Sequence, residues 1–323
     1  MTLKNTIKNY LELLVLYVLS WIYAVKVKLG ILKEKYGIIG FFQVDGLKLS
    51  RHINSEEMIA AAKVFDSFKP DDVIIGTYPK TGTHFTMGVV CSIYKEKGLV
   101  KPNDQRHHMI TLEIKLPTIL RLLSGQTGGQ GLLAYAEKSK SPRIFITHLP
   151  WDLWPRRVME RKVKVIFCMR NPKDTVCSYY PYVRKRGGLR ADTPWKTFFT
   201  NFLEGNVLYG SYAHYMRTWY PHRNNENVLN LQFEDMREDL ERHVRKIAEF
   251  LGVELTEEQI CRVAEANTFE SKKKEVGRGH AIYRQGKSGG WRSQLTVEQN
   301  EVMDEWINTE LDGMEDLKLK YGE

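Results

Sequence analysis

The sequence predicts an α/β fold of three layers, with helices on both faces of a central, mostly parallel β-sheet. Three observations support this class. Apolar runs of strand length alternate with helical segments through most of the chain. One such run leads through a polar turn directly into a helix, as in phosphate-binding loops. The chain has 323 residues, 42% of them apolar and 27% charged, which is enough for one large core.

The first half of the domain begins with a helix and then a strand–turn–helix unit. Residues 54–68 are expected to be helical, with Asn54 or Ser55 as the N-cap. Residues 71–78 ("DDVIIGTY") have the composition of a buried strand. A helix over 83–98, closed by Gly98, follows the turn.

The second half continues the alternation. A strand over 141–150 ends at Pro150, and a strand over 162–170 is followed by a helix that starts on Pro172. Further expected elements are a strand over 227–235, a helix over 236–252, and mainly helical structure after about residue 255, except for the glycine-rich segment 277–291.

Charge and cysteine content restrict the functional classes. The formal net charge of +9 fits a polyanionic ligand, nucleic acid or an acidic membrane surface. Because there is no long basic run and no zinc-finger or RNP-like pattern, nucleic acid is not an expected partner. The four cysteines are far apart in apolar contexts, which predicts buried free thiols and a reducing compartment: Cys91, Cys168, Cys177 and Cys261.

The N-terminal segment 1–36 is expected to be a leader preceding a single domain over 37–323. Leu13–Val25 is apolar around every face of a helix but shorter than a comfortable membrane span. No convincing cleavage site follows it. It predicts either a membrane-associated helix, with contact through residues 10–27, or a helix packed on the domain or in a dimer. Lysines after it favour a cytoplasmic domain.

The segment "GTYPKTGTHF", residues 76–85, has the features of an anion-binding turn. The N-terminus of the following helix offers backbone N–H groups and a positive dipole end. Gly82 permits close approach of a ligand, and Lys80 adds a full charge. The lysine precedes the glycine, so the segment does not have the pattern of a nucleoside triphosphate loop. Alone, it could also be an ordinary lysine-containing turn.

Two further groups are expected at the same sheet edge. Arg170 ends a strand and Ser178 lies eight residues on, where both can reach a second phosphate, although Arg170 could equally pair with Asp174. His148 ends the preceding strand, and imidazole titrates near neutral pH, which favours a general base over a structural histidine.

Taken together, the motifs "TYPKTGT", "THLP", "RNPKDTVCSYY", "FEDM" and "RQGKSGGWRSQLTVEQNE" resemble those of the cytosolic sulfotransferases in order and approximate spacing. These enzymes use 3′-phosphoadenosine 5′-phosphosulfate (PAPS) and release the bisphosphate PAP. The resemblance runs from about Gly40 to Trp306. It implies that the turn at 76–85 holds a 5′-phosphosulfate.

The resemblance also implies roles for individual residues. His148 matches the catalytic base, and Phe85 stands where a tryptophan stacks on adenine. The residues implied to contact the 5′-phosphosulfate are Lys80, Thr81, Gly82, Thr83 and His84. Those implied to contact the 3′-phosphate are Arg170, Ser178, Arg284, Gln285 and Gly286, and those near the adenine are Thr268 and Phe269.

Several further positions depart from the family pattern. Ile146 replaces a lysine two residues before the base, and Phe233 replaces a nucleotide-binding tyrosine. Gln285 replaces a cation near the 3′-phosphate, and Gly290 stands where the family has an aspartate. These changes concern rate and cofactor affinity more than reaction class. They also leave open the alternative that the protein is a nucleotide-binding module that binds PAP and does not catalyse transfer.

The expected reaction is sulfuryl transfer from PAPS to a hydroxyl or amine, with His148 removing the proton and Lys80 stabilising the leaving phosphate. No carboxylate cluster suits a metal, so we expect no metal requirement. Segment 292–301 resembles the family's dimer-forming segment and predicts a homodimer. Aromatic residues favour a small apolar or aromatic acceptor; a membrane-held enzyme acting on lipid or glycan remains the alternative.

Overall fold

The computed structural model describes residues 34–35, 37–51, 53–100, 109–114, 131–186, 188–190, 192–276 and 288–322. At its centre, five strands form one sheet in the order β6-β7-β5-β8-β9, and every neighbouring pair is parallel. The strands are β5 (Val73–Thr77), β6 (Met109–Thr111), β7 (Ile144–Thr147), β8 (Lys164–Met169) and β9 (Val228–Gln232). The predicted parallel sheet is therefore confirmed.

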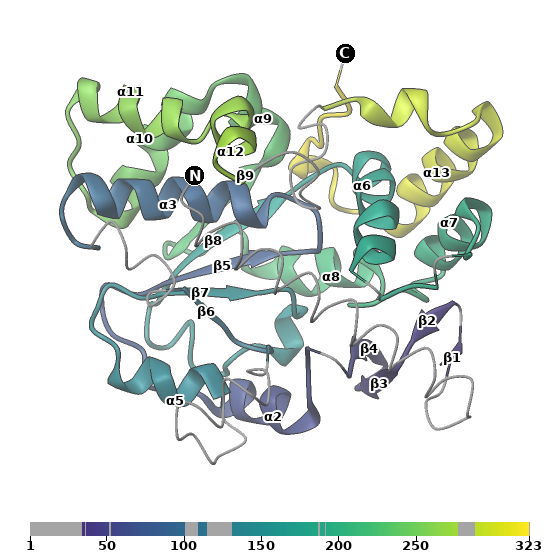
Figure 1. Ribbon diagram of the computed structural model, residues 1–323, viewed down its shortest axis with the longest axis horizontal. Helices are drawn as coiled ribbons and strands as arrows, with labels where there is room; N and C mark the ends of the chain where they lie inside the picture. Colours follow the sequence, from purple (N-terminus) through teal and green to yellow (C-terminus); the bar gives the residue numbers. More distant parts are fainter. Residues whose placement is uncertain are drawn as a thin grey trace, which may run out of the picture.

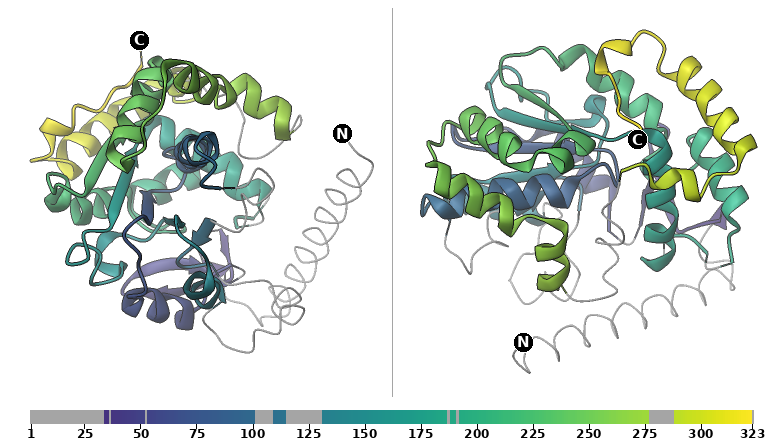
Figure 2. Two further views of the ribbon diagram at one scale, coloured as in Figure 1. Left: turned by 90° about the vertical axis from the view of Figure 1, so that its left-hand side faces the viewer. Right: turned by 90° about the horizontal axis from the view of Figure 1, so that it is seen from above.

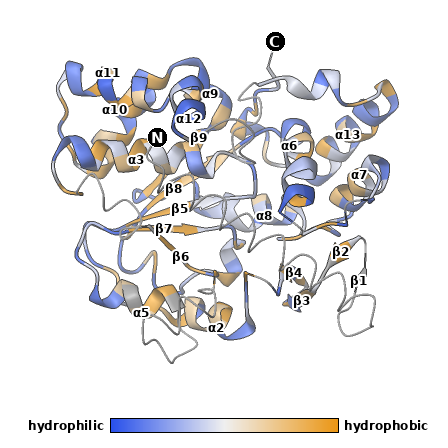
Figure 3. Cartoon of the chain, in the orientation of Figure 1, coloured by the Kyte–Doolittle hydropathy of each residue, from blue (hydrophilic) through white to orange (hydrophobic). Residues whose placement is uncertain are grey.

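Alternate residues of each strand pack on opposite faces of the sheet, as strand geometry requires. In β5, Ile74 belongs to one apolar cluster, whereas Val73 and Ile75 belong to the other. Both faces are buried, which explains why these strands are continuous apolar runs and not alternating ones. Figure 3 shows this apolar sheet inside more polar helices.

Helices cover both faces, which confirms the three-layer architecture (Figures 1 and 2). One face packs against α3 (Thr83–Glu96), α10 (Leu240–Leu251) and α11 (Glu257–Ala266). The other packs against α2 (Glu56–Val64), α5 (Gly131–Lys138) and α8 (Tyr212–Trp219). Further helices are α6 (Pro172–Lys185), α7 (Trp195–Leu203), α9 (Phe233–Glu238), α12 (Phe269–Val276) and α13 (Val297–Glu310).

Several helix ends follow the predicted signals. Ser55, rather than Asn54, caps α2 by accepting from the N–H of Met58. Asn171 caps α6, with Pro172 in its first turn. Gly98 follows α3 in the left-handed region, with φ +66°.

The structure corrects the predicted strand over 227–235 and the single helix over 236–252. The strand ends at Gln232, and Phe233 begins the short helix α9. The helical pattern then breaks at Asp239, because its carboxylate accepts from the N–H of Arg242 and starts the separate helix α10. Sequence reasoning also missed β6 and two short antiparallel pairs, β1 (Glu34–Lys35) with β2 (Ile38–Ile39) and β3 (Phe41–Val44) with β4 (Leu47–Ser50).

The predicted leader helix over Leu13–Val25 and residues 284–286 of the late loop lie outside the described residues. Among the helices that are described, none has the length and apolar character needed to cross a membrane. All four cysteines are free thiols; Cys91, Cys168 and Cys177 are buried as predicted, and Cys261 is half-buried.

Candidate functional site

The candidate site lies where three adjacent strands end. β7, β5 and β8 are neighbours in the sheet, and His148, the turn 78–82 and Arg170 follow them directly. The order of the strands reverses around β5, and open α/β sheets bind ligands outside the carboxyl ends at such a switch point. The fold therefore brings the three predicted groups to one edge.

The turn after β5 is held tightly against β8. The Thr81 hydroxyl lies 2.8 Å from the Tyr78 carbonyl and 2.9 Å from the Cys168 carbonyl, and the Cys168 thiol donates to the Thr81 carbonyl at 3.1 Å. Gly82 has φ +120°, and a Cβ there would lie 2.9 Å from Cys168 Sγ. Only glycine fits this conformation and this spacing.

Helix α3 starts at Thr83, and no side chain caps its first turn. The first turn of any helix has N–H groups without intrahelical acceptors, and its dipole favours an anion there. The Thr83 hydroxyl lies 2.8 Å from the Thr77 hydroxyl, inside the fold. The chemistry of this turn thus fits a phosphate or phosphosulfate group.

Lys80 connects this turn to α6. Its backbone has φ +73°, unusual for a residue with a side chain. Its Nζ lies 4.4 Å from the centre of the Tyr182 ring, a cation–π contact. Tyr182 belongs to the "SYYPY" run, so an aromatic side chain borders the lysine that is predicted to contact the transferred group.

His148 has a defined tautomer. Its Nδ1 lies 2.8 Å from the Thr77 carbonyl oxygen, which can only accept a hydrogen bond. Nδ1 therefore carries the proton, and Nε2 has the free lone pair that a base needs. Desolvation lowers the pKa of His148 to about 4, the Thr77 carbonyl opposes this shift, and the charge of Lys80 adds to it. The ring is neutral near pH 7.

Three neighbours of His148 complete its surroundings. The His148 N–H donates to Glu113 Oε1 at 2.9 Å, and its ring meets the Tyr209 ring edge-on at 5.2 Å. Tyr209 has φ +62°, a strained conformation that often occurs near functional sites. Sequence reasoning missed Thr77 and Glu113; a lone acid in the apolar run "MITLEI" was the available signal for Glu113.

Arg170 is buried and already paired. Its Nη2 lies 3.6 Å from Asp174 and its Nε 3.7 Å from Glu234, and its guanidinium lies 4.4 Å from the centre of the Phe233 ring. The pairing with Asp174 considered from the sequence is thus present. Burial raises the pKa of Glu234 to about 7, although the charge of Arg170 opposes this shift. Ser178 is half-buried on α6.

The residues implied to contact adenine lie around α3. Phe85 meets Phe233 edge-on at 5.8 Å. The Thr268 hydroxyl accepts from the Ser271 N–H and so starts α12, which begins at Phe269. A Cβ on Gly88 would lie 2.6 Å from Asn267 Oδ1, so this junction packs closely against α3.

The described end of the glycine-rich segment is attached beside Arg170. The Asp174 carboxylate accepts from the N–H groups of Gly289 at 2.8 Å and Trp291 at 3.0 Å. Asp174 therefore connects the start of α6 to the residues that follow Arg284, Gln285 and Gly286.

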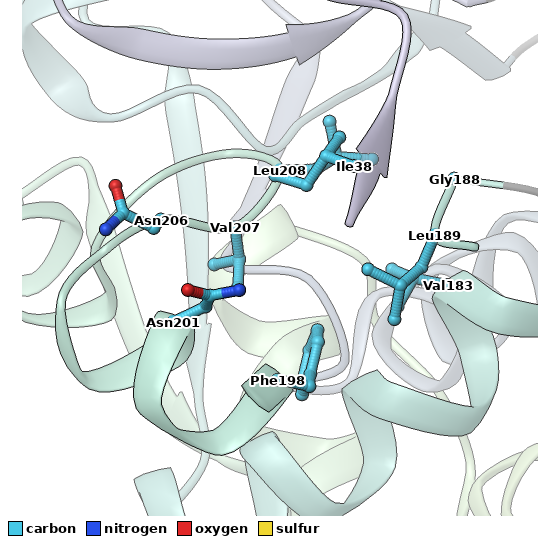
Figure 4. Close-up of a pocket in the computed structure, with 9 residues that line it drawn as sticks. All are labelled: Ile38, Val183, Gly188, Leu189, Phe198, Asn201, Asn206, Val207 and Leu208. Carbon is cyan, nitrogen blue, oxygen red and sulfur yellow. The ribbon is translucent and has the colours of Figure 1, made fainter. Parts of the chain in front are cut away.

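A small, mostly apolar pocket lies between the C-terminal end of α6, α7 and residues 206–208 (Figure 4). Val183 lies near the end of α6, and Gly188 and Leu189 follow that helix. Leu208 also lines the pocket, and the chain continues from it directly to Tyr209 beside His148. As for metals, no group of three or more potential ligands occurs within the part of the chain that the structure describes.

The family model for the sulfotransferase domain matches residues 70–315. The chain belongs to the sulfotransferase family. This sulfotransferase is 30% identical over 290 residues to amine sulfotransferase of Oryctolagus cuniculus, covering 83% of this chain and 90% of the relative. It is 34% identical over 249 residues to sulfotransferase 1A1 of Mus musculus, covering 73% and 82% of the two chains.

Two solved structures have folds similar to that of this chain. Mouse sulfotransferase SULT7A1 complexed with PAP has a TM-score of 0.70 and 25% identity, covering 84% of this chain and 95% of that chain. Retinol dehydratase in complex with androsterone and PAP has a TM-score of 0.69 and 25% identity, covering 84% and 88%. This chain is thus a sulfotransferase, and both of these structural neighbours contain PAP. The uncapped start of α3 and the buried Arg170 fit two phosphate groups.

Proposed function

We propose that this sulfotransferase transfers the sulfuryl group of PAPS to a hydroxyl or amine of a small apolar or aromatic acceptor, with His148 as general base and Lys80 as the stabilising cation. The hydrogen bond between His148 Nδ1 and the Thr77 carbonyl is the observation that carries the proposal. It leaves Nε2 unprotonated at the edge of the sheet where the phosphate turn also lies.

In the proposed step, His148 Nε2 takes the proton of the acceptor while the acceptor oxygen or nitrogen forms its bond to sulfur. The bond between sulfur and the bridging oxygen breaks, and its electron pair stays on the phosphate of PAP. Lys80 stabilises the charge that develops there. Because a sulfuryl group carries less charge than the phosphoryl group of a nucleotide, one lysine can take the place of magnesium.

The proposed nucleotide contacts follow the three neighbouring strands. Lys80, Gly82, Thr83 and His84 would hold the 5′-phosphosulfate, with Thr81 keeping the turn against β8. Arg170 and Ser178 would hold the 3′-phosphate, with Arg284–Gly286 joining from the late loop. Phe85, Phe233, Thr268 and Phe269 would surround the adenine. Ile146, which replaces the family lysine, packs in the apolar cluster beneath α3.

The acceptor class rests on aromatic neighbours of the reacting groups. Tyr182 borders Lys80 and Tyr209 borders His148, so an apolar or aromatic acceptor would contact rings on two sides. The similarity to an amine sulfotransferase supports including amines. We also propose a cytoplasmic homodimer through 292–301, where Val297 is 77% exposed at the start of α13, and a membrane contact through residues 10–27.

Transfer from radiolabelled PAPS to phenols, alcohols, sterols and amines tests this proposal. We expect transfer to at least one apolar or aromatic hydroxyl or amine without added metal. Tight binding of PAP with no transfer across the panel would instead support a module without turnover. A strict requirement for magnesium would contradict the role given to Lys80.

A further inference from the structure

We propose that Glu113 is a positioning residue for the base: its side chain, at the end of β6, holds the main chain of His148 and so fixes the direction of Nε2. The inference rests on the proposed role of His148. It concerns a residue that takes no part in the proposed bond-making step and contacts His148 through the main-chain N–H.

The first argument is geometry. Glu113 follows β6 by two residues, and β6 is the neighbour of β7, which ends just before His148. Glu113 Oε1 accepts from the His148 N–H at 2.9 Å. On the other side of β7, the Thr77 carbonyl at the end of β5 accepts from Nδ1. The ends of β6 and β5 thus hold the main chain and the ring of His148, respectively.

The second argument is burial. The Glu113 side chain is fully buried, its Oε2 has no hydrogen-bond partner, and no ion pair to it occurs among the described residues. Burial raises the pKa of its carboxyl to about 7. A buried carboxyl group without a cation is costly to the fold. The Thr147 hydroxyl and the His148 N–H both favour the ionised form of this carboxyl group. Burial without a cation argues against a purely stabilising role, whereas the hydrogen bond to the His148 N–H needs an acceptor at this position.

Asn54 extends this arrangement to the aromatic wall. It is buried, its Nδ2 donates to the Glu113 carbonyl at 3.0 Å, and it lies 3.5 Å from the Tyr209 hydroxyl. Tyr209 in turn packs edge-on against the His148 ring. Asn54 thus joins the main chain of Glu113 to the ring that faces the base, so the three residues surround His148 as one connected group.

The contact with the His148 N–H needs an oxygen acceptor but not a negative charge. Glu113→Gln keeps such an oxygen at the same reach. Glu113→Leu has a similar volume and no acceptor, so it leaves the His148 N–H unpaired. These two variants separate the hydrogen bond from mere filling of space, and the glutamine variant separates the bond from the charge.

Two readouts test the proposal on the full chain. The first, made with PAP bound, is the tautomer of His148, from imidazole ¹⁵N shifts of ¹⁵N-histidine-labelled protein, with His148→Gln used for assignment. We expect wild type and Glu113→Gln to show a single tautomer with protonated Nδ1. We expect Glu113→Leu to show a mixture of the two neutral His148 tautomers. The second is kinetics: Glu113→Gln should keep kcat within about threefold, and Glu113→Leu should lose at least about tenfold in kcat with KM for PAPS unchanged.

A Glu113→Leu variant that keeps both the tautomer and kcat would overturn the proposal. So would a Glu113→Gln variant as impaired as Glu113→Leu, because charge would then be the requirement. If the leucine variant does not fold, Glu113→Asp replaces it, since the shorter side chain withdraws the oxygen; it should behave as Glu113→Leu does. The tautomer measurement does not depend on turnover and therefore tests the role of Glu113 alone. If His148 is not the base, a different result shows it: His148→Gln would keep full activity.

Discussion

Replacing Gly82 with alanine should damage nucleotide binding far more than its small size suggests. Gly82 has φ +120°, and a Cβ there would lie 2.9 Å from Cys168 Sγ and 3.2 Å from the Phe233 ring. The backbone strain costs about 1–3 kcal/mol, and overpacking a filled site costs about 1–3 kcal/mol more. We therefore expect the turn to change shape when alanine replaces Gly82, because keeping the present shape would require both of these free-energy costs.

If the turn shifts to relieve the clash, the cost appears as lost affinity for PAP. A loss of about 2 kcal/mol corresponds to roughly 30-fold in Kd. Isothermal titration with PAP measures this directly, beside urea unfolding of the free protein. We expect Gly82→Ala to raise the Kd for PAP by at least about 30-fold.

Gly98→Ala is the matched control. Gly98 also has a positive φ, +66°, but nothing lies within 4 Å of a Cβ built there, and it follows the far end of α3. It should lower the free energy of unfolding by about 1 kcal/mol without changing the Kd for PAP. A Gly82→Ala variant that binds PAP as well as Gly98→Ala does would refute the reasoning.

Three further predictions follow from the described contacts. Because desolvation lowers the pKa of His148 to about 4, the base stays neutral as pH falls through 6.5, and kcat/KM should decline only below about pH 5; an acid limb near 6.5, measured with stable substrates, would contradict this. Asp72→Ala leaves the buried Arg143 without its ion pair and should lower the free energy of unfolding in urea by about 3–5 kcal/mol. Alanine at Asp66, whose side chain is 34% exposed and pairs with more exposed arginines, should lower it far less; equal effects would refute the contrast. Val297→Glu should shift the protein to monomers in sedimentation experiments with its fold intact, and an unchanged mass would remove segment 292–301 as the interface.

The features predicted well from sequence depend on short-range signals. Strand–turn–helix order, the helix starts at Ser55 and Pro172, and the residues that end β5, β7 and β8 are all visible within a few positions of the chain. Because parallel strands share an edge for their carboxyl ends, those residues could be expected to meet.

The missed features depend on contacts between distant segments. Glu113 meets His148 only because the chain crosses over to place β6 beside β7, and Asn54 meets Tyr209 across 155 positions. The division of α9 from α10 at Asp239 is a local choice between continuing the helix and capping the next one, and helical periodicity does not reveal it. Positive φ at Tyr209 likewise has no sequence signal, since tyrosine rarely adopts it.

The most direct test of the central claim is the rate of sulfuryl transfer in a single turnover, started from a preformed enzyme–PAPS complex. The Kd for PAP is measured on the same variants. His148→Gln removes the base, and His214→Gln is the control, because the side chain of His214 is 53% exposed and pairs at the surface with Asp152. The account predicts that His148→Gln slows transfer at least about 100-fold with PAP affinity unchanged, while His214→Gln behaves as wild type. Transfer by His148→Gln at the wild-type rate would contradict it.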